Sequence, residues 1–204
     1  MRNILDERFD EELVRQARGT LPRGHVYRFG YPSAILLGAG LPNLPIEMTA
    51  SRLAEKSLQE NHPFDLLEVR GLVSAIQCPL VVFRSATRMD SYVVMTEIRH
   101  GGENFVAAIH ANQRKGRLEV NTIRSVYPKF NKLIANWIVE SLVEYADKEK
   151  MVEWLSKQRS NSADVRKLFN HAAKIIQTFE NPKVLPDVEA EKTARPKKNH
   201  GFQL

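Results

Sequence analysis

The sequence predicts an α+β domain in which a four-stranded antiparallel sheet is flanked by N-terminal and C-terminal helices. Apolar residues recur with the helical period of 3.6 in the first part of the chain. Four consecutive segments then alternate with a period of two, and short turns rich in Gly, Asn and Ser separate them. The helical period returns after Pro128. Helices and strands grouped in this way are typical of α+β domains.

The residue pattern of the N-terminal region predicts a lead-in helix followed by irregular structure. Residues 1–19 have an amphipathic pattern with Phe9 and Leu13 on one side. Residues 20–45 are rich in Gly and Pro, which favours turns. A short strand is expected over residues 46–48.

Two helices are expected between this strand and the sheet. Thr49 is suited to cap a helix over residues 50–60. Asp65 and Glu68 have the spacing of a capping box and predict a second helix that contains Gly71, a residue that weakens helices slightly.

The sheet follows, with short connections that favour an antiparallel meander. The third strand is apolar on both sides, which predicts a central strand covered on much of both faces. The four expected strands are residues 80–84, 92–99, 105–112 and 117–125.

Helical patterns return over residues 131–146, 148–157 and 163–179, each with an apolar stripe. Beyond Pro182 the chain is charged and lacks periodicity, which predicts disorder. The sequence therefore predicts a lead-in helix over 1–19, an α+β domain over 20–158, a C-terminal helix within 159–182 packed on the domain, and a disordered charged tail over 183–204.

Composition narrows the class of protein. The 204 residues are 43% hydrophobic and 26% charged, which is ordinary for a globular protein. The single cysteine, Cys78, excludes an internal disulfide framework, and its apolar neighbours predict a buried, inert thiol. No apolar run is long enough to cross a bilayer, and no signal-peptide core is present, so a cytoplasmic location in a bacterial host and no membrane partner are expected. The net charge of +6 is compatible with a polyanionic partner.

Several segments resemble a known group of phage proteins. Leu-Glu-Val-Asn-Thr-Ile-Arg-Ser-Val-Tyr at 118–127 resembles the signature strand of the C-terminal domains of phage MuF-type head proteins and of related phage nuclease-like families. The Pro-Leu-Val-Val-Phe strand at 79–83 and the Trp-containing helix around Trp137 agree in order. The resemblance covers roughly residues 20–158. Those families are grouped with barnase, EndoU, colicin and RelE nucleases, so the resemblance implies a nuclease-like fold.

The resemblance also implies a reaction without a metal, in which the 2′-hydroxyl of RNA attacks the adjacent phosphate. This reaction needs a base, an acid and donors for the charged transition state. His has a pKa near neutrality and suits the first two roles. The catalytic candidates are His62, which the resemblance places at a helix turn, together with His110, Glu119, Asn121, Ser125 and Tyr127.

Strand parity connects four of these residues. Without a bulge, Glu119, Asn121 and Ser125 point to one face, and Tyr127 follows at the strand exit. A polar face on an inner strand is costly if it is only core. Substrate contacts are expected from Thr96, Arg117, Arg124 and Lys129.

Each of these assignments has a structural alternative. The polar strand positions fit an ordinary solvated sheet face. His62 can satisfy carbonyls at a helix end, His110 can be a hydrogen-bonded core histidine, and the hairpin cations can be a solvated tip.

The leading functional hypothesis is a metal-independent endoribonuclease of phage or mobile-element origin, acting on RNA as an effector. The alternative is a module with the same fold that binds nucleic acid or protein without catalysis. A protein inhibitor or a phage protein is the further partner considered. No cofactor is expected, and no metal is expected because paired-Cys and His-x-x-x-His spacings are absent.

Overall fold

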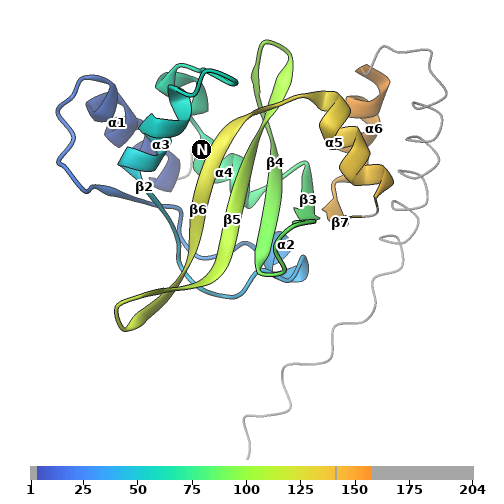
Figure 1. Cartoon of the computed structure of the whole chain (residues 1–204), viewed down its shortest axis with the longest axis horizontal. Coiled ribbons are helices and arrows are strands. Elements are labelled where there is room, and N and C mark those ends of the chain that lie inside the picture. Colours follow the sequence, from blue (N-terminus) through green and yellow to red (C-terminus); the bar gives the residue numbers. More distant parts are fainter. Residues whose placement is uncertain (1–3, 141, 158–204) are drawn as a thin grey trace, which may run out of the picture.

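The computed structural model describes residues 4–140 and 142–157. It is an α+β structure built on an open seven-stranded sheet with the order β1-β2-β6-β5-β4-β3-β7. All neighbouring strands are antiparallel except β2 and β6, which are parallel. Figure 1 shows the long strands β4, β5 and β6 in the middle, with α1 and α3 beside β2 and β6 and with α5 and α6 at the β3–β7 end.

The sheet is larger than the predicted four strands. The predicted meander is present as β3 to β6, and β5 is the central strand as expected. Two strands extend the sheet beyond β6, and one extends it beyond β3. The strands are β1 Val26–Arg28, β2 Ile46–Thr49, β3 Val81–Arg84, β4 Ser91–His100, β5 Glu103–Lys115, β6 Leu118–Lys129 and β7 Val143–Ala146.

Several of the described helices correspond to predicted ones. The expected lead-in helix is α1, and the helix expected after Thr49 is α3. The described helices are α1 Ile4–Ala17, α2 Ala34–Gly38, α3 Ala50–Ser57, the short 3-10 helix η1 Leu66–Val69, α4 Leu72–Gln77, α5 Asn131–Val139 and α6 Lys148–Lys157. The predicted helix 163–179 and the tail lie outside the described residues.

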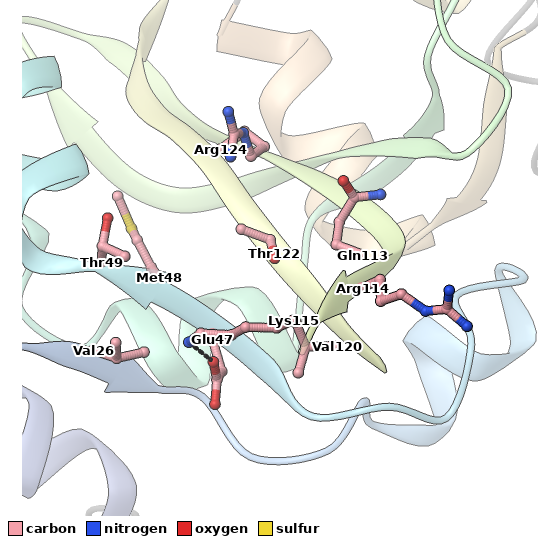
Figure 2. A pocket seen from close by; sticks show the side chains of 10 residues that line it. All are labelled: Val26, Glu47, Met48, Thr49, Gln113, Arg114, Lys115, Val120, Thr122 and Arg124. Atoms are coloured by element: carbon pink, nitrogen blue, oxygen red, sulfur yellow. Dashed lines mark hydrogen bonds and ion pairs between the residues drawn. The ribbon is translucent and has the colours of Figure 1, made fainter. Parts of the chain in front are cut away.

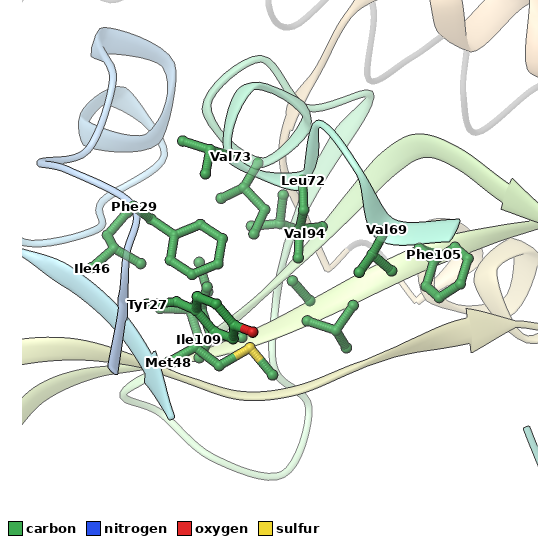
Figure 3. Packing of buried hydrophobic residues seen from close by; sticks show 14 of the residues in the cluster. Tyr27, Phe29, Ile46, Met48, Val69, Leu72, Val73, Val94, Phe105 and Ile109 are labelled. Atoms are coloured by element: carbon green, nitrogen blue, oxygen red, sulfur yellow. The ribbon is translucent and has the colours of Figure 1, made fainter. Parts of the chain in front are cut away.

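One face of the sheet packs on the N-terminal helices. Its core contains Phe9 and Leu13 of α1 together with Tyr27, Val94 and Ile109 from the strands. Figure 3 shows this packing, with Leu72 and Val73 of α4 above the strand residues. We call this side the α1 face. Burial of these side chains supplies most of the driving force for folding.

The opposite face is covered at one end by α5 and α6, and we call it the α5 face. Val81, Phe83 and Val106 from the strands pack there against Ile134 and Trp154. The buried indole of Trp154 donates a hydrogen bond to Oδ1 of Asn104 at 3.0 Å. Because buried polar groups are costly unless paired, this bond fixes how α6 docks on the sheet.

Two local predictions need correction. The Asp65–Glu68 capping box is present, but it opens η1 rather than a long helix. Gly71 does more than weaken a helix, because its φ of 74° lies in the left-handed region and separates η1 from α4. The helix predicted over 131–146 is also too long, since α5 ends at Val139 and Val143–Ala146 pairs with β3 as an edge strand.

The cysteine prediction also fails. Cys78 is exposed rather than buried. It lies at the C-terminal end of α4, where its backbone N–H donates to the carbonyl of Ser74. The apolar residues around it in sequence point into the core from the adjoining elements, which leaves the thiol at the surface.

A β-bulge divides β6 into two halves. Ile109 of β5 lies opposite Ile123, whereas the preceding residue, Ala108, lies opposite Ser125. Arg124 is therefore an extra residue on β6. Because side chains alternate between faces, one extra residue reverses the faces of all later positions.

Candidate functional site

A row of polar residues crosses five strands on the α5 face, beyond the part that α5 and α6 cover. In register, Ser91 lies opposite His110, and His110 lies opposite Thr122. Thr122 lies beside Glu47 of β2, and Glu47 lies opposite Arg28 of β1. Side chains at paired positions point to the same face. We call Arg28, Glu47, Thr122, His110 and Ser91 the polar row.

His110 is at the centre of the row, and two arginines affect it. Its pKa is lowered, first because burial disfavours the charged ring and then because the positive charges of Arg88 and Arg124 oppose protonation. Arg88 comes from the turn between β3 and β4, and Arg124 is the bulged residue of β6. His110 is therefore neutral at pH 7 and can accept a proton next to two cations that can bind an anion.

A pocket of about 260 Å³ lies beside the row. Figure 2 shows its lining from β1, β2, β5 and β6, with Thr122 and Arg124 on one strand and Gln113 on the next. Lys115 donates a hydrogen bond of 2.8 Å to Glu47 across the pocket. Val26 and Val120 add apolar surface. The combination of an apolar floor with a few polar groups is typical of a ligand site.

One atom next to His110 has no hydrogen-bond partner. The hydroxyl oxygen of Ser91 is buried, and it is unpaired among the residues that the structure describes. Buried polar atoms are usually satisfied, so such an atom calls for an explanation such as a water or a ligand. Its position in the polar row places a spare donor beside the imidazole.

A second cluster lies at the other end of β6. The ring of His62 is 5.6 Å from that of Tyr127 and 5.3 Å from that of Phe130. Nζ of Lys129 lies 5.6 Å from the Tyr127 ring and 5.1 Å from the Trp137 ring. Burial lowers the pKa of Lys129 and raises that of Tyr127. We call His62, Tyr127, Lys129 and Phe130 the aromatic cluster.

The predicted site residues thus fall into separate groups. His110 and Arg124 lie together, and His62, Tyr127 and Lys129 lie together at the other cluster. Ser125 is on the α5 face between the two, opposite Ala108. Thr122 and Tyr127 are five residues apart, roughly 15 Å along an extended strand. The two histidines are therefore not an acid–base pair around one small group.

Two predicted site residues are structural instead. Asn121 is fully buried on the α1 face, and its amide nitrogen donates to the carbonyls of Pro42 and Leu44 at 2.8 and 3.0 Å. Thr96 is also buried, and its hydroxyl donates to the carbonyl of Phe105. The prediction that Asn121 and Ser125 share a face depended on an unbulged strand, and the bulge at Arg124 separates them.

Glu119 and Arg117 lie away from the polar row, at the exposed β5–β6 hairpin. Glu119 pairs in register with Arg114, a neighbour of Lys115. Arg117 is in the turn beside Gly116, whose φ of 65° requires the left-handed region. The position of these residues fits the alternative interpretation, in which the charged hairpin is a solvated tip.

The sequence did not point to several members of the site. Arg88 is an ordinary turn residue in sequence, and only the β3–β4–β5 pairing brings it near His110. Glu47 lies on β2, whose partner β6 is distant in sequence, and Ser91 lies one residue before the expected strand 92–99. Thr122 has a signal in the sequence, since it lies between Asn121 and Ile123 and therefore points to the opposite face of the strand.

Metal clusters and membrane-spanning helices are both absent from the residues that the structure describes. Within residues 4–140 and 142–157, no cluster of three His, Cys, Asp or Glu side chains is arranged to hold a metal ion. None of the helices in that same portion has the length and apolarity needed to cross a membrane.

Comparison with known proteins gives one match. Residues 53–153 match the family model of the phage MuF C-terminal domain. No curated protein and no solved structure gives a significant match. The matched segment begins within α3, ends within α6 and includes β3 to β7, whereas β1 and β2 precede it. The part of the chain that carries His110, Arg88 and Arg124 is therefore similar to the phage MuF C-terminal domain.

Proposed function

We propose that the protein binds RNA on the polar row and cleaves it without a metal ion, with His110 as the general base. The observation that carries this proposal is the position of His110, between Ser91 and Thr122 and close to two arginines that act on its charge. A neutral imidazole beside fixed cations suits the abstraction of a hydroxyl proton next to a phosphate.

The reaction balances as a transphosphorylation. His110 takes the proton of a ribose 2′-hydroxyl, and the 2′-oxygen forms a bond to the adjacent phosphorus. The bond from phosphorus to the 5′-oxygen breaks, and that oxygen takes a proton from solvent. Arg88 and Arg124 stabilise the negative charge on the non-bridging oxygens. The products are a 2′,3′-cyclic phosphate and a free 5′-hydroxyl.

A cleavage assay in excess EDTA tests this proposal. The wild type is compared with His110→Ala, and His100→Ala serves as the matched control because His100 pairs with Glu68 away from the polar row. We expect cyclic-phosphate products from the wild type and the control. Loss of a positioned base lowers rates by a factor of about 100 or more, so His110→Ala should be nearly inactive. Intact RNA with the wild type, or full activity in His110→Ala, would overturn the proposal.

A second candidate function is RNA binding without cleavage. It is favoured by the separation of His62 from His110, since the row then holds one histidine and lacks a histidine acid. This candidate predicts that RNA binds to the wild type and to His110→Ala equally well and remains uncut. Binding measured by fluorescence anisotropy, run beside the cleavage assay, separates the two functions.

A further inference from the structure

The aromatic cluster at the end of β6 has features that the reaction at His110 does not use. Phe130 is 51% exposed even though it precedes α5 and adjoins the core. An exposed Phe ring between β6 and α5 calls for an explanation, because transfer of a Phe side chain from water into the core is strongly favourable. Its edge contact with His62 holds the ring at the surface.

The cluster combines aromatic surface with positive charge. Lys129 lies over the rings of Tyr127 and Trp137, where burial lowers its pKa. Lys132 is exposed one residue into α5. Proteins bind single-stranded nucleic acid with this combination, in which bases stack on aromatic rings and cations follow the backbone. A base paired in a duplex cannot stack in this way.

The geometry of β6 connects this cluster to the polar row. Thr122 is opposite His110, Ser125 follows the bulge on the same face, and Tyr127 comes two residues later. The exposed Arg124 lies between Thr122 and Ser125. A path along β6 therefore passes a hydroxyl, a guanidinium and a second hydroxyl before it reaches the aromatic rings.

We infer that the substrate is single-stranded RNA lying along β6, with one base stacked on Phe130 beside His62 while a phosphate more than one nucleotide away lies at His110. This inference rests on the proposed RNA-binding function. It names the substrate class and assigns a second subsite, which begins at Tyr127, roughly 15 Å from Thr122 of the polar row along the strand. It also gives His62 a role in binding rather than in proton transfer.

The test measures RNA affinity by fluorescence anisotropy in the His110→Ala background, so that the RNA stays intact. The probes are a labelled single-stranded oligonucleotide and a duplex of the same sequence. Phe130→Ala is compared with Val139→Ala, a control that removes a 39% exposed apolar side chain from the other end of α5. Thermal unfolding confirms that both variants fold.

We expect Phe130→Ala to weaken single-strand binding about tenfold, the effect of losing one stacking contact. Val139→Ala should bind as the parent does, and Phe130→Trp should restore binding. In the cleaving background, Phe130→Ala should raise KM for the oligonucleotide, whereas Val139→Ala should leave it unchanged.

The outcomes separate this inference from the proposed function. Cleavage that depends on His110 combined with unchanged single-strand affinity in Phe130→Ala overturns the inference alone. Equal losses for single strand and duplex also overturn it. Binding that depends on Phe130 without any cleavage supports the inference and leaves only the reaction to be rejected. A protein that binds neither RNA overturns both.

Discussion

Asn121 and Ser125 lie four residues apart on the same strand, yet they belong to opposite sides of the molecule. Asn121 is buried on the α1 face and holds two loop carbonyls through its amide nitrogen. Ser125 lies on the α5 face, between the polar row and the aromatic cluster. Both residues are polar, and both looked alike in sequence. The single bulged residue between them, Arg124, decides which one is structural and which one faces the candidate site.

A polar residue on an inner strand can therefore have two quite different uses. On the α1 face, Asn121 replaces backbone pairing for the Gly- and Pro-rich segment that leads into β2. Its orientation is unambiguous, because a flipped amide would set an oxygen against two carbonyl oxygens. On the α5 face, the polar side chains form a row across five strands instead, and two of them, Glu47 and Thr122, line a pocket.

The largest effect on stability is expected from Asn121→Ala. The substitution removes two hydrogen bonds; the Leu44 carbonyl loses this donor, whereas the Pro42 carbonyl keeps the backbone N–H of Leu44. Each lost bond of this kind costs about 1 kcal/mol or somewhat more, so the free energy of unfolding should fall by about 2–3 kcal/mol. Urea denaturation followed by circular dichroism measures the change.

Ser125→Ala is the matched control for that prediction. A small polar side chain on a partly solvated face contributes little, and we expect a change within about 0.5 kcal/mol. Equal destabilisation by the two substitutions would contradict the assignment of Asn121 to the structural α1 face and of Ser125 to the face of the candidate site.

The central strands of the sheet could be predicted from the sequence, whereas the strands at its edges could not. The meander β3–β6 follows from alternation and short turns, which are local signals. The short strand expected over residues 46–48 is present as β2, but its pairing with β6 could not be predicted from a local pattern, and neither could β1 and β7, which have three and four residues. The apolar stripe before Tyr145 continued the helical period and concealed the break after Val139.

Only part of the candidate site could be predicted from the sequence, because the rest depends on strand pairing and on the bulge in β6. His110 and Arg124 were singled out by residue type and strand position, and the structure brings them together. Arg88 could not be found, because a turn residue joins the group only through the pairing of β4 with β5. The bulge at Arg124 has no clear sequence signal, and it changed the face of every residue after it.

The charges of Arg88 and Arg124 should affect the pH dependence of RNA cleavage, because they act on the pKa of His110. The folded-state pKa of His110 is lowered, so the neutral base persists below pH 6.5, and the acid limb of kcat/KM for RNA cleavage should lie below that value. Arg124→Gln removes one opposing charge and should move the acid limb to higher pH. The limb should not reach the ordinary histidine value, because burial is the larger cause of the shift and persists.

The same shift has a consequence for stability. The unfolded chain binds the proton more readily than the folded chain, so the stability that comes from His110 is complete above pH 6.5 and is lost as pH falls through the folded pKa. His110→Gln should flatten this part of the stability profile.

An acid limb of kcat/KM that stays in place in Arg124→Gln would show that Arg124 does not act on the imidazole of His110.

The smallest effect is expected from Lys115→Met at the pocket. The Lys115–Glu47 pair is 2.8 Å long, but the lysine side chain is 55% exposed, and exposed pairs contribute at most about 1 kcal/mol. Unfolding should therefore change little. If RNA phosphates lie along the polar row, however, the variant should lose one cationic contact, and the slope of log affinity against log salt should become shallower by a little under one unit. A stability loss of several kcal/mol with an unchanged salt slope would place Lys115 with Asn121, as a residue that holds the fold rather than one that faces a ligand.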